Sequence, residues 1–267
     1  MTIRVHTFHR MSTGLVAMAI GLAGTFPSAH ARPWDEIAAS NEITVCANPN
    51  ALPYASDKPS EPGFQIEIAR AIAGKLGVKL RPIWIIPRHR AGMFDCDLLM
   101  DSIVRDSIHP PSLKLSMPYH QSGVSLAFGA AEEPASTYRD LKPRTRVGAM
   151  MNSYASVVLG KAGAIPVFFG TEDDMMEALA KGEIQAAAVT AASAGYFNKQ
   201  RGGNLLKIAR AEDSEPDLKW SVAIGMRRSD AALIEKVNAV LGDLLASGEV
   251  AAIYANCGVE HRVPAGR

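Results

Sequence analysis

The sequence predicts an α/β protein built from two lobes, with two extended strands that cross between them. Strand-like and helix-like segments alternate along most of the 267 residues, which is typical of sheets covered by helices. A polar stretch at residues 129–144 interrupts the alternation and separates two α/β units. A late strand-like segment at 220–226 returns the chain toward the first unit. We therefore expect a cleft between two lobes, with the crossings near 123–129 and 218–223.

The first 31 residues predict a cleaved export signal rather than a part of the fold. Arg4 and Arg10 give a positive start, residues 13–26 are uncharged and mostly apolar, and Ala29-His30-Ala31 fits a small-x-small cleavage site. A membrane anchor is the less favoured alternative, because the apolar run falls short of the ~20 residues that span a bilayer. We expect cleavage after Ala31 and an exported mature chain without a membrane span.

The charges of the mature chain nearly balance. The signal holds two of the 28 Lys and Arg residues and none of the 27 Asp and Glu residues, which leaves a formal charge of −1. A nucleic-acid surface requires a basic excess. Nucleic acids are therefore not predicted partners.

Three cysteines enter an oxidising compartment if the chain is exported. One disulfide and one thiol is the simplest arrangement. Cys46 and Cys96 both belong to strand-like segments of the first unit, so they are the favoured pair, and Cys257 would be the thiol. Three buried thiols remain an equally open alternative.

The first unit opens with a strand at 43–47 that ends in a rigid, polar loop. Asn48, Pro49 and Asn50 turn the chain, and Pro53 keeps the next residues extended beside Tyr54. Apolar residues at helical spacing then predict a helix over 64–76 that ends at Gly77. Further strands are predicted over 78–86, 97–100 and 123–128.

The second unit begins with a strand at 146–150. Asn152 and Ser153 form a turn and cap before a helix over 154–161. A strand at 166–169, a helix at 172–181 and an alanine-rich strand at 184–189 follow. After the returning strand, Ser229 is predicted to cap a helix over 231–246, and a last helix covers 249–256.

Ten polar or aromatic residues are candidates for the walls of the cleft, because ligands of open α/β sheets bind beyond the carboxyl ends of the strands. Each also has a purely structural interpretation, such as turn formation, helix capping or packing. Tyr119 is more readily explained by packing of the hinge than by ligand stacking. The candidates are Asn48, Asn50, Tyr54, Asp101, Ser102, Tyr119, Asn152, Ser153, Tyr154 and Thr190.

The sequence offers no catalytic or metal-binding pattern. The four histidines of the mature chain stand at no recognised ligand spacing, and no nucleophile motif is present. We therefore expect a non-enzymatic binding protein without a metal or cofactor.

Motifs spread over nearly the whole mature chain resemble the periplasmic solute-binding proteins that include the polar amino-acid receptors of ABC importers. The matching pieces, in order, are the Pro49–x–x–x–Pro53–Tyr54 loop, Gly63-Phe64, 73–78 (AGKLGV), 91–95 (AGMFD), 116–119 (SMPY), Asp140-Leu141-Lys142, Val147-Gly148 and 252–258. The resemblance implies the two-lobed, type II periplasmic-binding-protein-like fold. It also implies a periplasmic location, an ABC permease as partner, and hinged closure of the lobes. We expect lobe 1 over 34–127 and 218–267, and lobe 2 over 128–217.

A narrower set of motifs is similar to a branch of that family encoded beside quinoprotein (PQQ-dependent) methanol dehydrogenases. These are 45–50 (VCANPN), Cys96-Asp97, 194–197 (AGYF) and 224–227 (IGMR). The strand that contains Cys46 is the most specific of them. The resemblance implies an accessory role beside a PQQ-dependent alcohol dehydrogenase.

Two departures from the receptor pattern argue against an amino-acid ligand. His109 stands where the receptors have an arginine for the ligand carboxylate, with Arg105 four residues away, and Thr190 stands where they have an acid for the ligand amine. The main alternative to the accessory role is an importer receptor for another small polar solute or an organic acid. A remote alternative is a receptor-derived dehydratase, for which Asp101 is the only acid expected in the cleft. The short segment at 80–95 also leaves little room for a helix that the receptors have there.

Overall fold

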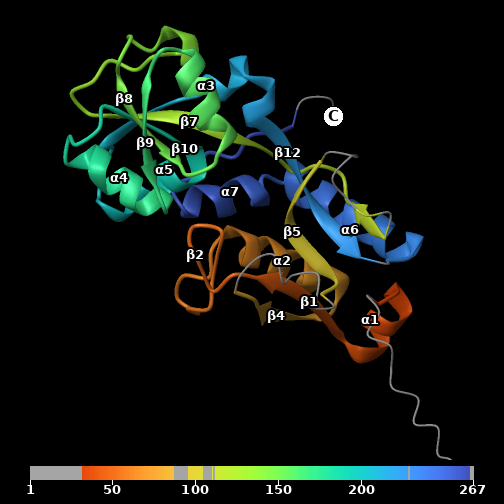
Figure 1. Ribbon diagram of the computed structural model, residues 1–267. Coiled ribbons are helices and arrows are strands. Elements are labelled where there is room, and N and C mark those ends of the chain that lie inside the picture. The colour runs from red at the N-terminus through yellow and green to blue at the C-terminus, as the bar shows by residue number, and fades with distance from the viewer. Residues whose placement is uncertain (1–31, 87–95, 105–109, 111, 228, 265–267) are drawn as a thin grey trace, which may run out of the picture.

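The computed structural model describes residues 32–86, 96–104, 110, 112–227 and 229–264. The expected signal at 1–31, the motif at 91–95, Arg105 and His109 lie outside these residues. The chain forms two α/β lobes (Figure 1). Lobe 1 is the lower one in the view, and lobe 2 carries the labels α3, α4 and α5.

Lobe 1 is formed by the first part of the chain and by its last two helices. Its elements are α1 (Trp34–Ser40), β1 (Glu42–Ala47), β2 (Asn50–Ala51), β3 (Ala55–Ser56), α2 (Phe64–Leu76), β4 (Lys79–Trp84), β5 (Leu98–Ile103), β6 (Leu113–Leu115), α6 (Ala231–Ala246) and α7 (Glu249–Asn256). Its core gathers apolar side chains from β1, β5, α2, α6 and α7.

Lobe 2 is formed by the middle of the chain. Its elements are η3 (Tyr138–Asp140), β8 (Arg146–Met150), α3 (Tyr154–Lys161), β9 (Ile165–Phe169), α4 (Glu172–Ala180), β10 (Ala186–Thr190), α5 (Ala191–Gln200), β11 (Leu206–Ala209), η4 (Ala211–Ser214) and η5 (Pro216–Leu218). Two apolar clusters cover the two faces of its sheet, one with α3 and the other with α4 and α5.

Two long strands, β7 (His120–Gly129) and β12 (Lys219–Arg227), belong to both lobes. The strand order is β4-β1-β5-β12-β7-β10-β8-β9, with β6 added to β12 and β11 added to β7. β7 pairs antiparallel with β12 over His120–Gly123 and with β10 from Val124 onward. The change of partner precedes the lobe boundary at 127 that we expect from the sequence. The predicted pair of crossing strands is thus present as the centre of one continuous sheet.

Several predicted elements have different limits in the structure. β5, which was predicted to begin at Asp97 and to end in Asp101-Ser102, runs from Leu98 to Ile103, where it pairs antiparallel with β12. The cap of α6 is Asp230 rather than Ser229, since the Asp230 carboxylate accepts a hydrogen bond from the Leu233 amide. Several elements were not predicted at all, among them α1, β6, α5 and β11.

No single helix among the described residues meets the two criteria of a membrane span, sufficient length and sufficient hydropathy. α6 and α7 meet them only together, and the chain bends by 72° between them.

Candidate functional site

The two lobes meet through a chain of hydrogen bonds that includes two of the predicted cleft residues. The hydroxyl of Tyr54, from lobe 1, donates to Oγ1 of Thr190, from lobe 2, at 3.0 Å. Oγ1 of Thr190 lies 3.0 Å from Oε2 of Glu172 and 3.0 Å from Oγ of Ser193. It also accepts a hydrogen bond from the Ser193 amide. The protein's own groups therefore use the whole hydrogen-bonding capacity of the Thr190 hydroxyl.

Local backbone geometry holds Tyr54 in this position. Tyr54 lies in the turn between β2 and β3, where its amide donates to the carbonyl of Ala51 at 2.7 Å. Its ring packs against Phe64 with centroids 5.1 Å apart. Gly63 has φ of +82°, and a Cβ there would lie 2.6 Å from the Tyr54 carbonyl oxygen. Only glycine fits both this conformation and this approach.

The sequence predicts no carboxylate at the end of β10, where Thr190 stands. In the structure, Glu172 supplies one. It occupies the first turn of α4, and Oε1 accepts a hydrogen bond from the Thr190 amide at 3.0 Å. Burial raises the pKa of Glu172, although hydrogen bonds from Ser193 and Thr190 favour its charged form. The missed signal is topological: α4 begins after β9, so its first turn lies at the same edge of the sheet as Thr190.

A second group of contacts joins the lobes beside this chain. The carboxylate of Glu61, before α2, accepts hydrogen bonds from Tyr196 and Gln200 of α5, both at 2.9 Å. Gly195 allows α5 to approach the C-terminal segment so closely that a Cβ would lie 2.4 Å from the Gly258 carbonyl oxygen. Figure 1 shows α7 running between the two lobes at this place.

The structure places the other predicted residues of lobe 1 in turns, strands and buried contacts of that lobe. Oδ1 of Asn48 accepts a hydrogen bond from the exposed Asn50 amide, which is a turn-forming contact. Ser102 is buried against Gly225 of β12, and Asp101 is half-buried within β5. Tyr119 is fully buried, and its hydroxyl donates to the carbonyl of Met100. The preferred packing interpretation of Tyr119 agrees with these contacts.

The predicted residues at the start of α3 form a separate group. Asn152 has φ of +59° and is exposed, and the Tyr154 hydroxyl donates to Asp217 at 3.1 Å. Ser153 is the N-cap residue, but its side chain makes no capping bond. Its Oγ atom is buried and has no hydrogen-bond partner among the described residues. The Ser153 hydroxyl therefore lies without a described partner at the start of α3, where the first N–H groups of a helix lack intrahelical acceptors.

The hinge contains a stack of aromatic rings bordered by ion pairs. His120 stacks on Tyr254 with centroids 4.5 Å apart and on His261 with centroids 5.5 Å apart. Burial lowers the pKa of His120 to about 3, and His261, Arg262 and Arg210 add to the effect. The imidazole of His120 is therefore neutral at physiological pH.

The C-terminal segment is tied to lobe 2 by Arg262. Its guanidinium lies 3.1 Å from the buried carboxylate of Glu212 and 2.9 Å from Asp213. Glu212 also accepts a hydrogen bond from Ser125 of β7 at 2.9 Å. Residues that follow α7 therefore connect the two lobes a third time.

A disulfide joins Cys46 to Cys96, with the Cα atoms 5.5 Å apart, and Cys257 is a buried thiol. The residue after Cys96, Asp97, is also buried and pairs with Arg32 at 2.7 Å. Within the part of the chain that the structure describes, no group of three or more His, Cys, Asp or Glu side chains could hold a metal ion.

Part of the chain is similar in sequence to known proteins. The chain is 28% identical over 144 residues to membrane-bound lytic murein transglycosylase F of Yersinia pestis, strain Pestoides F. The match covers 48% of this chain and 28% of that protein, so this chain spans less than a third of the relative's length.

Solved structures share the fold over most of the chain. A polar amino acid ABC uptake transporter substrate-binding protein from Streptococcus thermophilus has a TM-score of 0.70 at 19% identity, covering 86% of this chain and 91% of that one. The unliganded, open L-cystine solute receptor of Neisseria gonorrhoeae has a TM-score of 0.68 at 17% identity, covering 84% and 95%. The ancestral cationic amino acid solute-binding protein AncCDT-1 has a TM-score of 0.69 at 21% identity, covering 83% and 97%.

The family follows from a match that extends over both lobes. The model of the bacterial extracellular solute-binding proteins, family 3, matches residues 43–258. This range includes the loop of Tyr54, both crossing strands and the Thr190–Glu172 contact. The chain belongs to the bacterial extracellular solute-binding proteins, family 3.

Proposed function

We propose that this chain is a periplasmic solute-binding-protein-like module that acts as an accessory partner of a PQQ-dependent alcohol dehydrogenase. Its role is non-enzymatic. The observation that carries the proposal is the direct closure of the lobes by side chains of the protein. Tyr54 bonds to Thr190, and Glu61 bonds to Tyr196, across the two lobes. A module that holds its lobes together through its own groups presents a fixed surface to a partner protein.

The residues that resemble the dehydrogenase-associated branch take part in this closure. Tyr196 and Gly195 belong to the 194–197 motif, and they make the contacts of α5 with Glu61 and Gly258. Cys46 and Cys96 belong to two further motifs and form the disulfide of lobe 1. The narrower resemblance thus concerns residues that fix the shape of the molecule.

Deletion of the gene tests this proposal. We expect the deletion strain to lose PQQ-dependent alcohol oxidation in periplasmic extracts, while the amount of dehydrogenase protein stays unchanged. The wild-type gene should restore the activity, and a variant without the disulfide, Cys46→Ala with Cys96→Ala, should restore less of it. Unchanged alcohol oxidation in the deletion strain would contradict the accessory role.

A second candidate function is that of an ABC-importer receptor for a small polar solute. Two observations favour it: the carboxylate of Glu172 at the lobe contact and the unpartnered hydroxyl of Ser153 at the start of α3. The first would accept a ligand ammonium, and the second would donate to a ligand anion. The carboxylate makes a purely anionic organic acid a poor ligand.

A thermal-shift screen of the mature chain separates the two functions. A solute that binds only the folded state must raise the melting temperature. A hit that is lost in Glu172→Gln or Ser153→Ala supports the receptor function. Absence of any hit in a panel of amino acids, amines and sugars, together with the deletion phenotype above, supports the accessory function.

A further inference from the structure

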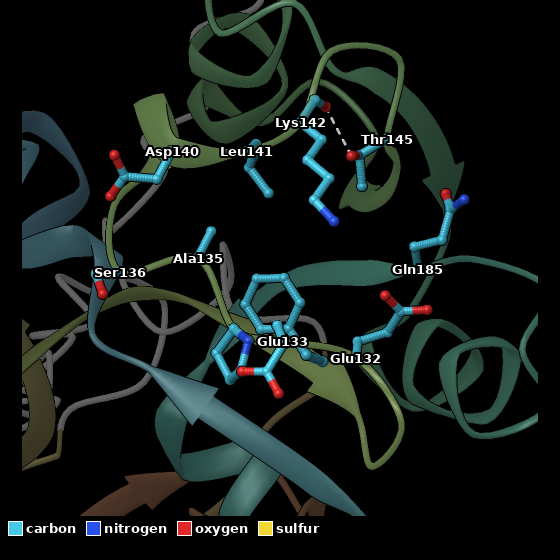
Figure 2. Close-up of a pocket in the computed structure, with 11 residues that line it drawn as sticks. Glu132, Glu133, Ala135, Ser136, Asp140, Leu141, Lys142, Thr145 and Gln185 are labelled. Carbon is cyan, nitrogen blue, oxygen red and sulfur yellow. Dashed lines mark hydrogen bonds between the residues drawn. The ribbon is translucent and has the colours of Figure 1, made fainter.

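Lobe 2 contains a cavity of about 340 Å³ at the end opposite the lobe contact (Figure 2). Its walls include Thr145, which precedes β8, and Gln185, which precedes β10. Because β8 and β10 are parallel, the cavity lies at the amino ends of the strands, whereas Thr190 lies at the carboxyl end of β10. Its volume falls in the range of about 300–1,000 Å³ that is usual for small-molecule sites.

The cavity contains charged groups of both signs that make no contact with one another. Lys142 extends toward it from one side, Glu132 lies on the facing side, and the neighbouring Glu133 directs its carboxylate away from Lys142 (Figure 2). All three side chains are exposed. None of these three side chains makes a hydrogen bond or ion pair with another residue in the described part of the chain. Two carboxylates and one ammonium therefore stand around the mouth of the cavity without neutralising each other.

The walls that carry these charges are held in place by other bonds. Asp140 is used in a capping box with Thr137, and Oγ1 of Thr145 donates to the Lys142 carbonyl at 2.7 Å. On the other wall, the Glu132 carbonyl accepts a hydrogen bond from Lys207 at 3.0 Å. Phe128 and Leu141, which are both buried, give the cavity an apolar floor. The charged side chains thus extend from a preorganised frame.

We propose that this cavity is a second binding site, for a small aliphatic amino compound that carries a carboxylate. The ligand carboxylate pairs with Lys142, and its ammonium groups pair with Glu132 and Glu133, while its hydrocarbon chain covers the floor. One lysine and two glutamates without partners favour a ligand with one carboxylate and two ammonium groups. The site goes beyond the proposed function, because none of its residues takes part in the lobe contact.

Three probes of similar length separate the contribution of each charge. L-Lysine has one carboxylate and two ammonium groups, 6-aminohexanoate has one of each, and 1,5-diaminopentane has no carboxylate. We expect isothermal titration to give binding in the order L-lysine, 6-aminohexanoate, 1,5-diaminopentane. Lys142→Ala should weaken L-lysine by about fivefold or more, the loss of one charge-assisted bond, and should not weaken 1,5-diaminopentane. Lys161→Ala, an exposed lysine elsewhere on lobe 2, is the matched control.

A variant of the lobe contact locates the binding. If L-lysine binds in this cavity, Glu172→Gln leaves its affinity unchanged, and a double variant Glu132→Gln with Glu133→Gln weakens it. The proposal is overturned if the affinity depends on Glu172 and not on Lys142, since the ligand would then occupy the space between the lobes. It is equally overturned if none of the three probes binds at millimolar concentration.

Discussion

At the scale of single residues, Thr190 and Glu172 explain how this chain differs from the receptor pattern. Thr190 stands where an acid is expected, but its amide and hydroxyl both contact the Glu172 carboxylate. The carboxylate at the end of β10 is therefore supplied by Glu172, from the first turn of α4. Sequence comparison along one strand misses this, because the two residues are 18 positions apart.

The raised pKa of Glu172 predicts a dependence of stability on pH. Burial raises this pKa above its ordinary value of 4.5, so the folded state holds the proton more tightly than the unfolded state. The stabilisation from this group is complete below that value and is lost as the pH rises through the raised pKa. As the pH is raised above 4.5, we expect the unfolding free energy of the wild type to fall more than that of Glu172→Gln.

Denaturant titrations at a series of pH values measure this difference. Glu183→Gln, an exposed carboxylate of the same lobe, is the control and should follow the wild type. Parallel curves for Glu172→Gln and the wild type would show that Glu172 titrates alike in both states.

His120 predicts the opposite trend at acid pH. Burial lowers its pKa from 6.5 to about 3, so the unfolded state takes up a proton first. Stability is present above pH 6.5 and falls by up to about 1.4 kcal/mol per pH unit as the pH drops toward about 3. His120→Phe keeps a ring for the stack with Tyr254 and should show a shallower acid slope in urea titrations. An unchanged slope would contradict the assignment.

At the scale of elements, the strongly periodic segments were predictable. Helices α2, α3, α6 and α7 have the limits that were predicted from their apolar spacing, although Asp230 rather than Ser229 caps α6. Strand β8 likewise begins and ends where expected. These segments could be predicted because the spacing of their apolar residues is itself a signal of helix or strand.

The elements that were missed depend on partners distant in the sequence. β6 exists because β12, more than a hundred residues later, pairs with it. β11 exists because it adds to β7, and α5 begins directly at Thr190 without a separating loop. Tyr54 and Thr190 could be named as candidates from the sequence. Their hydrogen bond and the contact of Glu172 with Thr190 could not be predicted, because they too join residues distant in the sequence.

The segment after α7 should stabilise the fold through the contact of Arg262 with Glu212. Arg262→Ala would leave the buried Glu212 carboxylate with Ser125 as its remaining side-chain partner in the described residues. We expect a loss of about 2 kcal/mol in unfolding free energy, because an unpaired buried charge is costly. Urea titration measures this loss.

Two further variants make the measurement specific. Arg139→Ala removes a well-exposed guanidinium that lies 3.8 Å from Glu215, and it should change stability little. Combining Arg262→Ala with Glu212→Gln should recover part of the loss. Equal losses from Arg139→Ala and Arg262→Ala would argue against a structural role of the C-terminal segment.

At the scale of the whole molecule, the lobe contact should control the separation of the lobes. Tyr54→Phe combined with Tyr196→Phe removes the two hydroxyls that reach across it. We expect small-angle X-ray scattering to show a larger radius of gyration, because the lobes can then rotate about β7 and β12. Tyr154→Phe, which removes a hydroxyl bond within lobe 2, is the control and should leave the radius unchanged. An unchanged radius in the double variant would show that the hydroxyls do not hold the lobes.

The central claim is that this fixed, two-lobed module serves a PQQ-dependent alcohol dehydrogenase. Native mass spectrometry of the mature chain with the quinoprotein dehydrogenase of the same organism tests it most directly. We predict a complex of defined stoichiometry at micromolar concentrations, weakened in the variant Tyr54→Phe with Tyr196→Phe. Only free components at those concentrations, for the wild type as for the variant, would contradict the claim.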